Sequence, residues 1–303
     1  MTDPIVLSDR LSLSPITYGV WRLADDPAGS GPDVVRRKID TCLEHGITSF
    51  DHADIYGEYR CEGLFGAALR EAPELRERMQ IITKCGIRLP GPGLPGVRVH
   101  HYDTSKATVI ACVERSLREL HTDYLDLLLI HRPDWLTPAD ETADAFDQLI
   151  HEGKVRHVGV SNYSPEQFDR LQSRLPMPLV TNQVEISLLH MQALEDGTLD
   201  QAERLRRPPM AWSPLSGGRL FDGGTDRAGL MRALENVAAE HGPGVTPSQV
   251  ALAWVAALPS TPAVIIGSNQ PERIREAAAS TALRLTREQW FALWAAARGR
   301  AIP

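Results

Sequence analysis

A complete strand–helix unit is visible in residues 153–173, GKVRHVGVSNYSPEQFDRLQS. Residues 155–160 form a short apolar run of the length typical of a buried strand. Ser164 then supplies a helix N-cap, Pro165 occupies the first helical position, and Gln167 stands at the third. These signals predict a strand that is followed almost directly by a helix.

The same pattern recurs eight times along the chain without a break in composition. The expected strands are residues 16–21, 47–51, 80–86, 125–130, 155–160, 179–184, 209–213 and 263–266. The expected helices are residues 33–45, 61–71, 105–120, 138–151, 165–173, 193–206, 229–241 with 247–257, and 271–279. Eight such pairs are typical of one parallel α/β barrel. We therefore expect residues 1–303 to form a single domain with a (β/α)8 TIM-barrel fold.

The two ends of the chain predict additions to this barrel. Residues 5–15, IVLSDRLSLSP, indicate a small β-hairpin around Ser8–Asp9–Arg10 that would plug one end of the barrel. An extra C-terminal helix is expected at about 286–298, because Thr286 can cap it and Glu288 and Gln289 follow in its first turn.

The composition excludes several classes of protein. The chain has 303 residues, 43% of them apolar and 23% charged, which fits an ordinary globular protein. Its net charge of −7 argues against non-specific binding of nucleic acid, and no stretch approaches the ~18 apolar residues of a membrane span. The N-terminus lacks the basic and apolar regions of a signal peptide. We expect a cytoplasmic protein with four reduced, scattered cysteines, Cys42, Cys61, Cys85 and Cys112.

Four reactive side chains stand at or just beyond the ends of apolar runs. Asp51 ends ITSFD, Lys84 ends QIITK and His131 ends YLDLLLIH. Tyr56 follows the first run within five residues. Since the carboxyl ends of parallel strands share one rim, these side chains are expected to meet there. Only four of the 32 basic residues are lysines, which makes a lysine at a strand end look like a chemical requirement.

Together these four residues would form a proton-donating device. Tyrosine is protonated at neutral pH, and a nearby ammonium lowers its pKa toward the working range of a general acid. Lys84 would supply the ammonium with Asp51 as its counterion, and His131 could orient a carbonyl oxygen. Tyr56 and His131 would then stabilise an alkoxide that develops on a carbonyl carbon. Such a device needs a hydride source, which predicts a nicotinamide site in the same chain.

Residues suited to a nicotinamide site occur in the second half of the chain. Ser161 and Asn162 follow the fifth strand and Gln183 ends the sixth, so their side chains could hold a carboxamide. Trp212 ends the seventh strand and offers a flat face on which a nicotinamide ring could stack.

Two loops are expected to bind the phosphates of this cofactor. Residues 213–224 are rich in glycine, and residues 267–274 lead into a helix; they follow strands seven and eight, where phosphates commonly bind in this fold. Arg273 lies in the first turn of that helix, where it could reach a phosphate or stack on adenine. Residues 91–96, GPGLPG, match G-x-G-x-x-G, but two prolines and the lack of a following helical pattern indicate an exposed, mobile loop.

These motifs resemble those of the aldo-keto reductases, barrel enzymes that reduce aldehydes and ketones with NADPH. The resemblance covers nearly the whole chain and is carried by DHADIYG (51–57), ITK (82–84), LLLIHRPD (127–134) and GKVRHVGVSNY (153–163). It implies that the catalytic tetrad is Asp51, Tyr56, Lys84 and His131. It implies cofactor contacts for Gly19, Val20, Trp21, Ser161, Asn162, Gln183, Trp212, Ser213, Leu215, Gly217, Gly267, Ser268, Asn269, Arg273 and Glu276.

Two departures from the family pattern bear on the cofactor and the substrate. Many members carry a lysine at the position of Gly267, where it pairs with the 2′-phosphate of NADP, and often an asparagine in place of Ala277. Because Arg273 is retained, NADPH is the expected cofactor, with NADH as an alternative. Only GRAIP follows the last helix, too short for the specificity loop of many mammalian members. The substrate is expected to be a small carbonyl compound, selected by loops 22–32, 87–103 and 217–228.

Two alternative functions stay open. The same fold and cofactor site occur in potassium-channel β-subunits, so the chain could be a nicotinamide-binding sensor or regulatory subunit with little turnover. It could also be a metal-dependent barrel hydrolase, because His52 and Asp54 beside Asp51 give the sequence D-H-x-D. No metal is expected there, since Lys84 would repel a cation. The oligomeric state is open, with a monomer slightly favoured.

Overall fold

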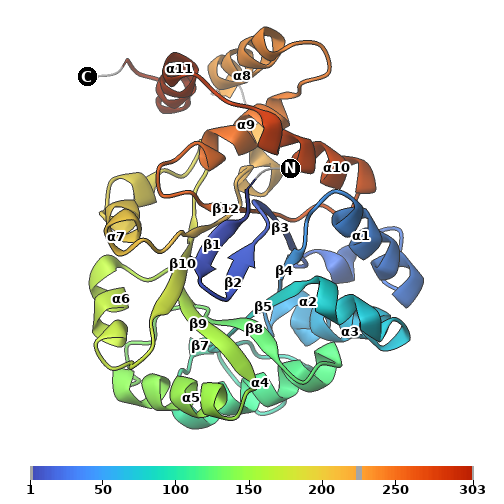
Figure 1. The fold of residues 1–303 in the computed structure, drawn as a ribbon, viewed down its shortest axis with the longest axis vertical. Coiled ribbons are helices and arrows are strands. Elements are labelled where there is room, and N and C mark those ends of the chain that lie inside the picture. The colour runs from blue at the N-terminus through green and yellow to red at the C-terminus, as the bar shows by residue number, and fades with distance from the viewer. Residues whose placement is uncertain (1–2, 223–226, 302–303) are drawn as a thin grey trace.

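Eight parallel strands close into a barrel in the computed structural model, which describes residues 3–222 and 227–301 (Figure 1). The barrel strands are β3 (Ile16–Gly19), β4 (Ser49–Asp51), β5 (Gln80–Cys85), β8 (Leu125–Ile130), β9 (Val155–Ser161), β10 (Leu179–Glu185), β11 (Met210–Trp212) and β12 (Ala263–Ile266). Neighbouring strands follow the chain order, and β12 pairs with β3 to close the ring. The predicted (β/α)8 barrel is therefore confirmed.

Helices surround the barrel on its outer side (Figure 1). The α-helices are α1 (Pro32–Glu44), α2 (Tyr56–Tyr59), α3 (Cys61–Glu71), α4 (Lys106–Leu120), α5 (Ala139–His151), α6 (Pro165–Gln172), α7 (Thr198–Leu205), α8 (Ala228–His241), α9 (Pro247–Ala256), α10 (Pro271–Ala279) and α11 (Arg287–Arg298). Short 3₁₀ turns are η1 (Leu23–Asp25), η2 (Pro73–Arg78), η3 (Gln192–Leu194), η4 (Ser216–Phe221) and η6 (Ser280–Ala282).

Capping signals explain why several helix starts were readable from the sequence. Ser164 caps α6 with a complete capping box, in which its hydroxyl accepts from the Gln167 backbone and the Gln167 side chain accepts in return. Thr286 caps α11 in the same way, which confirms the extra C-terminal helix. Thr246 caps α9 through an equivalent box.

Two segments differ from the expectation. The helix expected at 193–206 is divided, because Gly197 takes a left-handed conformation (φ 85°) between η3 and α7. Within 87–103, two short strands, β6 (Ile87–Arg88) and β7 (His101–Tyr102), pair antiparallel. Strands of two residues are too short to give a periodic signal. Residues 91–96, between these strands, are mostly exposed and are not helical, as predicted.

The predicted N-terminal hairpin is present and covers one end of the barrel. Its strands are β1 (Ile5–Ser8) and β2 (Leu11–Leu13), and it lies across the front of the barrel in Figure 1. Its leucines are buried with interior residues of the barrel strands. The Ser8 hydroxyl lies 2.9 Å from Nε2 of His157, near the start of β9, so the hairpin closes the amino-terminal end. The carboxyl-terminal end, which carries the predicted site residues, is left uncovered by it.

Helices α8 and α11 lie beyond the ring of helices that encloses the barrel, at the top of Figure 1, with α9 between them and the strands. Trp254 of α9 and Trp290 of α11 stack with ring centroids 4.7 Å apart. Each indole N–H donates to the backbone carbonyl of the other residue, at 3.1 and 3.0 Å. Trp254 and Trp290 therefore join α9 to α11 by packing.

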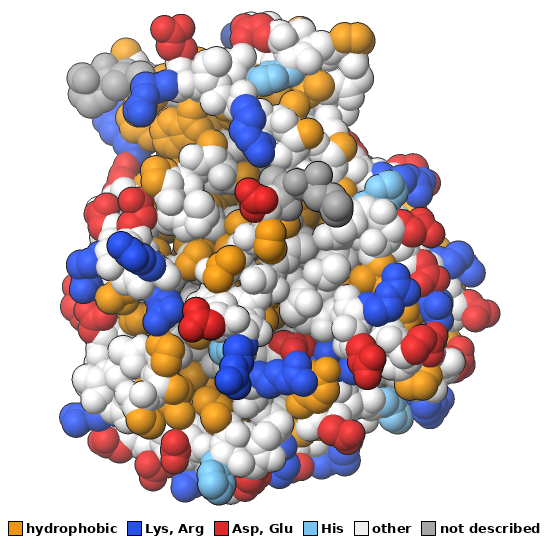
Figure 2. Space-filling model, in the orientation of Figure 1, with side chains coloured by type: hydrophobic (Ala, Val, Ile, Leu, Met, Phe, Trp, Pro, Cys, Tyr) orange, Lys and Arg blue, Asp and Glu red, His pale blue; other side chains and the backbone are white. Residues whose placement is uncertain are grey.

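The surface carries charges of both signs. Figure 2 shows acidic and basic side chains interspersed over the face that bears the hairpin, with apolar patches near the end formed by α8 and α11. Within residues 3–222 and 227–301, no helix is long and apolar enough to cross a membrane. All four cysteines are buried and free, which agrees with reduced thiols.

Candidate active site

The four predicted rim residues lie together at the carboxyl end of the barrel. Lys84 Nζ donates to Asp51 Oδ2 at 2.8 Å and to the Tyr56 hydroxyl at 3.1 Å. It also donates to the His52 carbonyl at 2.7 Å, so the three donors of the ammonium are all used. The His131 ring lies edge-on to Tyr56, with centroids 5.9 Å apart. Residues from three separate strand ends thus form one cluster.

Burial and charge act against each other on Lys84. The side chain is fully buried, and burial alone would lower its pKa. The Asp51 carboxylate and the Tyr56 phenol outweigh this effect and raise the pKa of Lys84 above its ordinary value. Gln183 Nε2 in turn donates to Asp51 Oδ1 at 2.8 Å and fixes the counterion. Lys84 is therefore held as an ammonium that points at the Tyr56 oxygen.

The pKa of the Tyr56 phenol is shifted upward, whereas a downward shift was expected. Burial raises its pKa, and the opposing effect of Lys84 only reduces that rise. The prediction of a net downward shift is therefore wrong, because desolvation of a phenolate costs more than one neighbouring ammonium returns. The phenol consequently stays protonated at neutral pH, as a proton donor must.

His131 is held in its neutral form. Burial lowers its pKa well below the ordinary value, and the cations Lys84 and Arg132 lower it further. A neutral imidazole keeps one N–H donor and one acceptor. Within the described residues, Nδ1 of His131 is buried without a hydrogen-bond partner. The ring can therefore donate a hydrogen bond without adding a second charge next to Lys84.

The residues predicted to hold a carboxamide form a linked chain beside this cluster. Asn162 Nδ2 donates to the Ser161 hydroxyl at 2.8 Å and to the His131 carbonyl at 3.2 Å. Trp212 Nε1 donates to Asn162 Oδ1 at 3.0 Å. Asn162 itself has a positive φ of 60°, which an asparagine tolerates better than most residues. The Trp212 ring is therefore oriented by the same residue that contacts the histidine strand end.

A cavity of about 1410 Å³ joins these groups to the two predicted phosphate loops. Its lining includes nearly every predicted site residue: Gly19, Trp21, Asp51, Tyr56, His131, Ser161, Asn162, Gln183, Trp212, Ser213, Leu215, Gly217, Gly267, Ser268, Asn269, Arg273 and Glu276. Two predicted residues are absent from the wall. Lys84 lies behind Tyr56, and Val20 is buried in the core with its backbone N–H donating to the Asp51 carbonyl at 3.0 Å.

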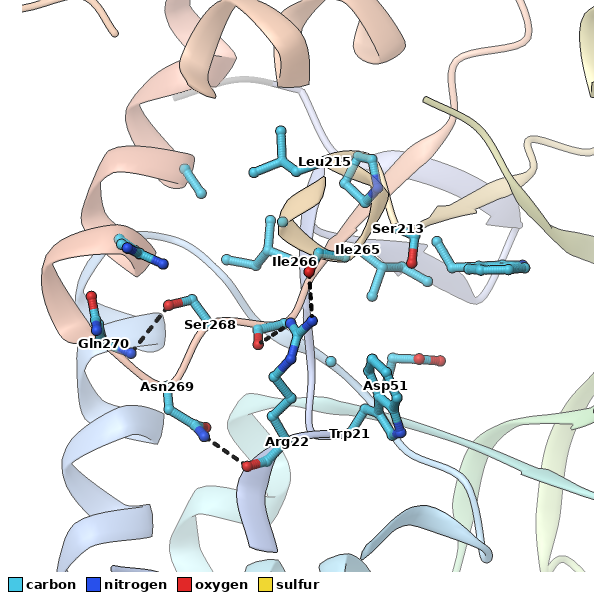
Figure 3. Close-up of a pocket in the computed structure, with 18 of the residues that line it drawn as sticks. Trp21, Arg22, Asp51, Ser213, Leu215, Ile265, Ile266, Ser268, Asn269 and Gln270 are labelled. Atoms are coloured by element: carbon cyan, nitrogen blue, oxygen red, sulfur yellow. Dashed lines mark hydrogen bonds between the residues drawn. The ribbon is translucent and has the colours of Figure 1, made fainter. Parts of the chain in front are cut away.

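Arg22 is a cavity residue that the sequence interpretation missed. Its guanidinium donates to the Gly217 carbonyl at 3.0 Å and to the Gly267 carbonyl at 3.2 Å. In Figure 3 the side chain extends between the loop that carries Leu215 and the segment that carries Ser268. Asn269 Nδ2 donates to the Arg22 carbonyl at 2.7 Å and anchors its backbone. Arg22 therefore bridges the two loops; its place directly after Trp21 was the available signal.

The residues of the D-H-x-D sequence do not converge on one point. The His52 ring is buried edge-on against Phe65, and burial lowers its pKa to about 3. Asp54 is buried on the side of Cys112 and Arg115, where burial raises its pKa to about 6. In the part of the chain that the structure describes, no group of three or more His, Cys, Asp or Glu side chains could hold a metal ion.

Known proteins are similar to this chain in sequence and in fold. The model of the aldo/keto reductase family matches residues 15–298. A 6-dehydroglucose reductase from Agrobacterium fabrum is 46% identical over 298 residues, covering 98% of this chain and 99% of that protein. The oxidoreductase YdhF from Escherichia coli is 50% identical over 290 residues, covering 96% and 95%. An aldo/keto reductase from Klebsiella pneumoniae, solved in complex with NADP and acetate, is 27% identical with a TM-score of 0.77, covering 97% and 94%.

The chain belongs to the aldo/keto reductase family, and its cavity lies at the carboxyl-terminal end of the barrel. It is accordingly an oxidoreductase with a barrel fold, and NADP is the cofactor bound in the Klebsiella pneumoniae structure.

Proposed function

We propose that the protein reduces an aldehyde or ketone to an alcohol by hydride transfer from NADPH, with Tyr56 as the proton donor. The observation that carries this proposal is the Lys84 ammonium, which lies within hydrogen-bond distance of both Asp51 and the Tyr56 hydroxyl. Tyr56 forms part of the wall of the same cavity as Trp212 and Arg273, so the donor faces the space where a dinucleotide and a small carbonyl compound would meet.

Each residue of the cluster has a distinct role in this reaction. A bound reduced nicotinamide supplies the hydride. Tyr56 donates its proton to the carbonyl oxygen as negative charge develops there, and neutral His131 donates a hydrogen bond that orients the same oxygen. Lys84 stabilises the phenolate that Tyr56 becomes, and Asp51 keeps Lys84 charged and in place.

The residues along the cavity fit a dinucleotide. Trp212 presents a ring held by Asn162, against which a nicotinamide can stack. Arg22 already binds the backbone of both phosphate loops, and Arg273 lines the wall in the first turn of α10. Cations and exposed backbone at a helix start are what phosphate groups require. The cavity therefore has an aromatic end and a cationic end in the order that the cofactor needs.

We infer a preference for NADPH, with NADH as an alternative. Arg273 is the cation available for a 2′-phosphate, whereas Gly267 contributes no charge. A side chain at Gly267 would meet Arg22 Nη1 at 3.5 Å and the Gly19 carbonyl at 3.9 Å, both ordinary contact distances. The absence of a cation there therefore reflects the residue type rather than a lack of space.

The test compares wild type with Tyr56→Phe in reduction of aldehydes, followed by the loss of nicotinamide absorbance. We expect turnover to fall by about 10²- to 10⁴-fold, the usual contribution of a general acid. Quenching of tryptophan fluorescence by NADPH should persist, because the phenol hydroxyl is not needed to hold the cofactor. Near wild-type reduction by the variant would disprove the proton-donor assignment.

Substrates for this assay follow from the relatives and from the open alternative. A relative at 46% identity is named for 6-dehydroglucose, a sugar aldehyde, so hydroxylated aldehydes belong in the panel beside simple ones. Tight binding of NADPH without oxidation across a broad panel would favour a nicotinamide-binding sensor instead of an enzyme.

A further inference from the structure

Arg132 lines the cavity but takes no part in the reaction proposed above. It follows His131 directly after β8. Its guanidinium carbon lies 5.9 Å from the Trp212 ring centroid. Within residues 3–222 and 227–301, this guanidinium has no hydrogen-bond or ion-pair partner, although it carries five N–H donors.

The other cations near the reacting groups are already engaged. Lys84 is paired with Asp51, and Arg22 donates to two backbone carbonyls. Arg132 is therefore the guanidinium at this end of the cavity whose donors remain for a bound molecule, within the part of the chain that the structure describes.

The barrel topology places the backbone of Arg132 across the barrel from β12, while its guanidinium reaches the Trp212 ring at the end of β11. Those loops follow β11 and β12, whereas Arg132 follows β8. In the closed order β12-β3-β4-β5-β8, β8 lies four places from β12 in a ring of eight strands, which puts it on the opposite side of the barrel. A dinucleotide whose nicotinamide stacks on Trp212 therefore has its reacting end next to Arg132, which leaves the guanidinium beside the substrate.

We propose that Arg132 binds an oxygen on the carbon next to the reacting carbonyl, so that the preferred substrates are 2-hydroxyaldehydes. This inference rests on the proposed function. His131 and Arg132 are consecutive residues at one strand end, so their donors can reach oxygens on neighbouring carbons of one substrate. A hydroxyl suits this position better than a carboxylate, because an alkoxide develops on the next carbon and a second anion there would be repelled.

The cavity mouth also suits a polyhydroxylated carbon chain. Trp21 lines the cavity and is 55% exposed, and the guanidinium carbon of Arg22 lies 5.0 Å from its ring centroid, so part of an aromatic ring is open to a bound molecule. Aromatic faces contact C–H groups while a guanidinium binds oxygens, and the two together match a molecule with alternating C–H and O–H groups.

The test measures the ratio of kcat/KM for glyceraldehyde to kcat/KM for propanal, which lacks the 2-hydroxyl. We expect Arg132→Met to lower this ratio by about 10-fold or more, mainly through a higher KM for glyceraldehyde, because the hydrogen bond to a charged group is lost. The ratio for Arg132→Lys should lie between those of wild type and Arg132→Met, since lysine keeps the charge but lacks the planar guanidinium. Arg287→Met, an exposed arginine of α11, provides the matched change in charge outside the cavity and should leave the ratio unchanged.

Three outcomes would overturn the proposal. An equal loss of kcat/KM for glyceraldehyde and for propanal would show that Arg132 maintains the structure of the site and does not recognise the 2-hydroxyl. An unchanged ratio in both variants would remove it from recognition altogether. A loss confined to glyoxylate, tested in parallel, would assign it to carboxylates. Loss of NADPH binding, measured by tryptophan fluorescence, would show that Arg132→Met is misfolded. The kcat/KM ratio of Arg132→Lys would then decide the question. Failure of wild type to reduce any aldehyde would instead contradict the proposed function.

Discussion

The two ends of the barrel are built on opposite principles. At the amino-terminal end, the hairpin buries leucines such as Leu13, and the Ser14 hydroxyl accepts from two backbone N–H groups while donating to the Ile16 carbonyl. At the carboxyl-terminal end, a charged pair is buried, His131 Nδ1 is buried without a partner among the described residues, and Asn162 takes a positive φ. One end thus supplies stability, and the other carries the strain and unpaired groups typical of a functional site.

The largest expected effect comes from Lys84→Met, which removes the centre of the polar end. We expect turnover to fall by about 10²- to 10⁴-fold, since the phenolate of Tyr56 loses its ammonium. Stability should also fall, by about 3–5 kcal/mol, because Asp51 is left buried and uncompensated. Steady-state kinetics and urea unfolding measure the two effects; Lys106→Met, outside the cavity, is the matched control. Wild-type turnover in Lys84→Met would show that the charged pair at the carboxyl-terminal end of the barrel is not needed for catalysis.

Leu13→Ala tests the opposite end. The side chain is fully buried in the hairpin, so its truncation should lower the free energy of unfolding by about 2–5 kcal/mol. The kcat of the folded variant, measured well below its unfolding midpoint, should stay near the wild-type value because the hairpin lies at the other end from the cavity. A large loss of kcat with unchanged stability would contradict the division between the ends.

Arg22→Met should weaken NADPH binding by about 10-fold, because the bridge between the loops at Gly217 and Gly267 is lost together with a cation near the phosphates. Fluorescence titration measures the dissociation constant. Arg118→Met, an exposed arginine of α4, controls for the change in net charge. Unchanged affinity in the Arg22 variant would show that the bridge is not part of the cofactor site.

The smallest expected effect is that of Gly267→Lys, which tests whether residue 267 lies near the 2′-phosphate of NADPH. The position has room for a side chain, and the added cation should raise the preference for NADPH over NADH by a few-fold to about 10-fold. The ratio of kcat/KM for the two cofactors is the readout, and its dependence on salt should increase. No change in the ratio would place the 2′-phosphate away from residue 267.

Much of the fold was readable from short segments. The strand runs and the capping residues Ser164 and Thr286 act within a few residues, so their signals survive in the sequence alone. Two elements were not predicted correctly. Gly197 interrupts an expected helix because it takes a left-handed conformation, and β6 and β7 are too short to give a periodic pattern. The candidate residues Asp51 and Lys84 were found because both stand at strand ends, which this fold gathers on one rim.

What the sequence by itself determined is the order of strands and helices and the rim on which the reactive side chains stand, because periodicity, caps and strand ends are properties of neighbouring residues. Only the tertiary structure decided the rest. The bridge from Arg22 to Gly217 and Gly267 joins three distant strand ends, and the upward shift in the pKa of Tyr56 depends on burial by residues far along the chain. Contacts and desolvation of this kind arise from packing, which short-range patterns do not encode.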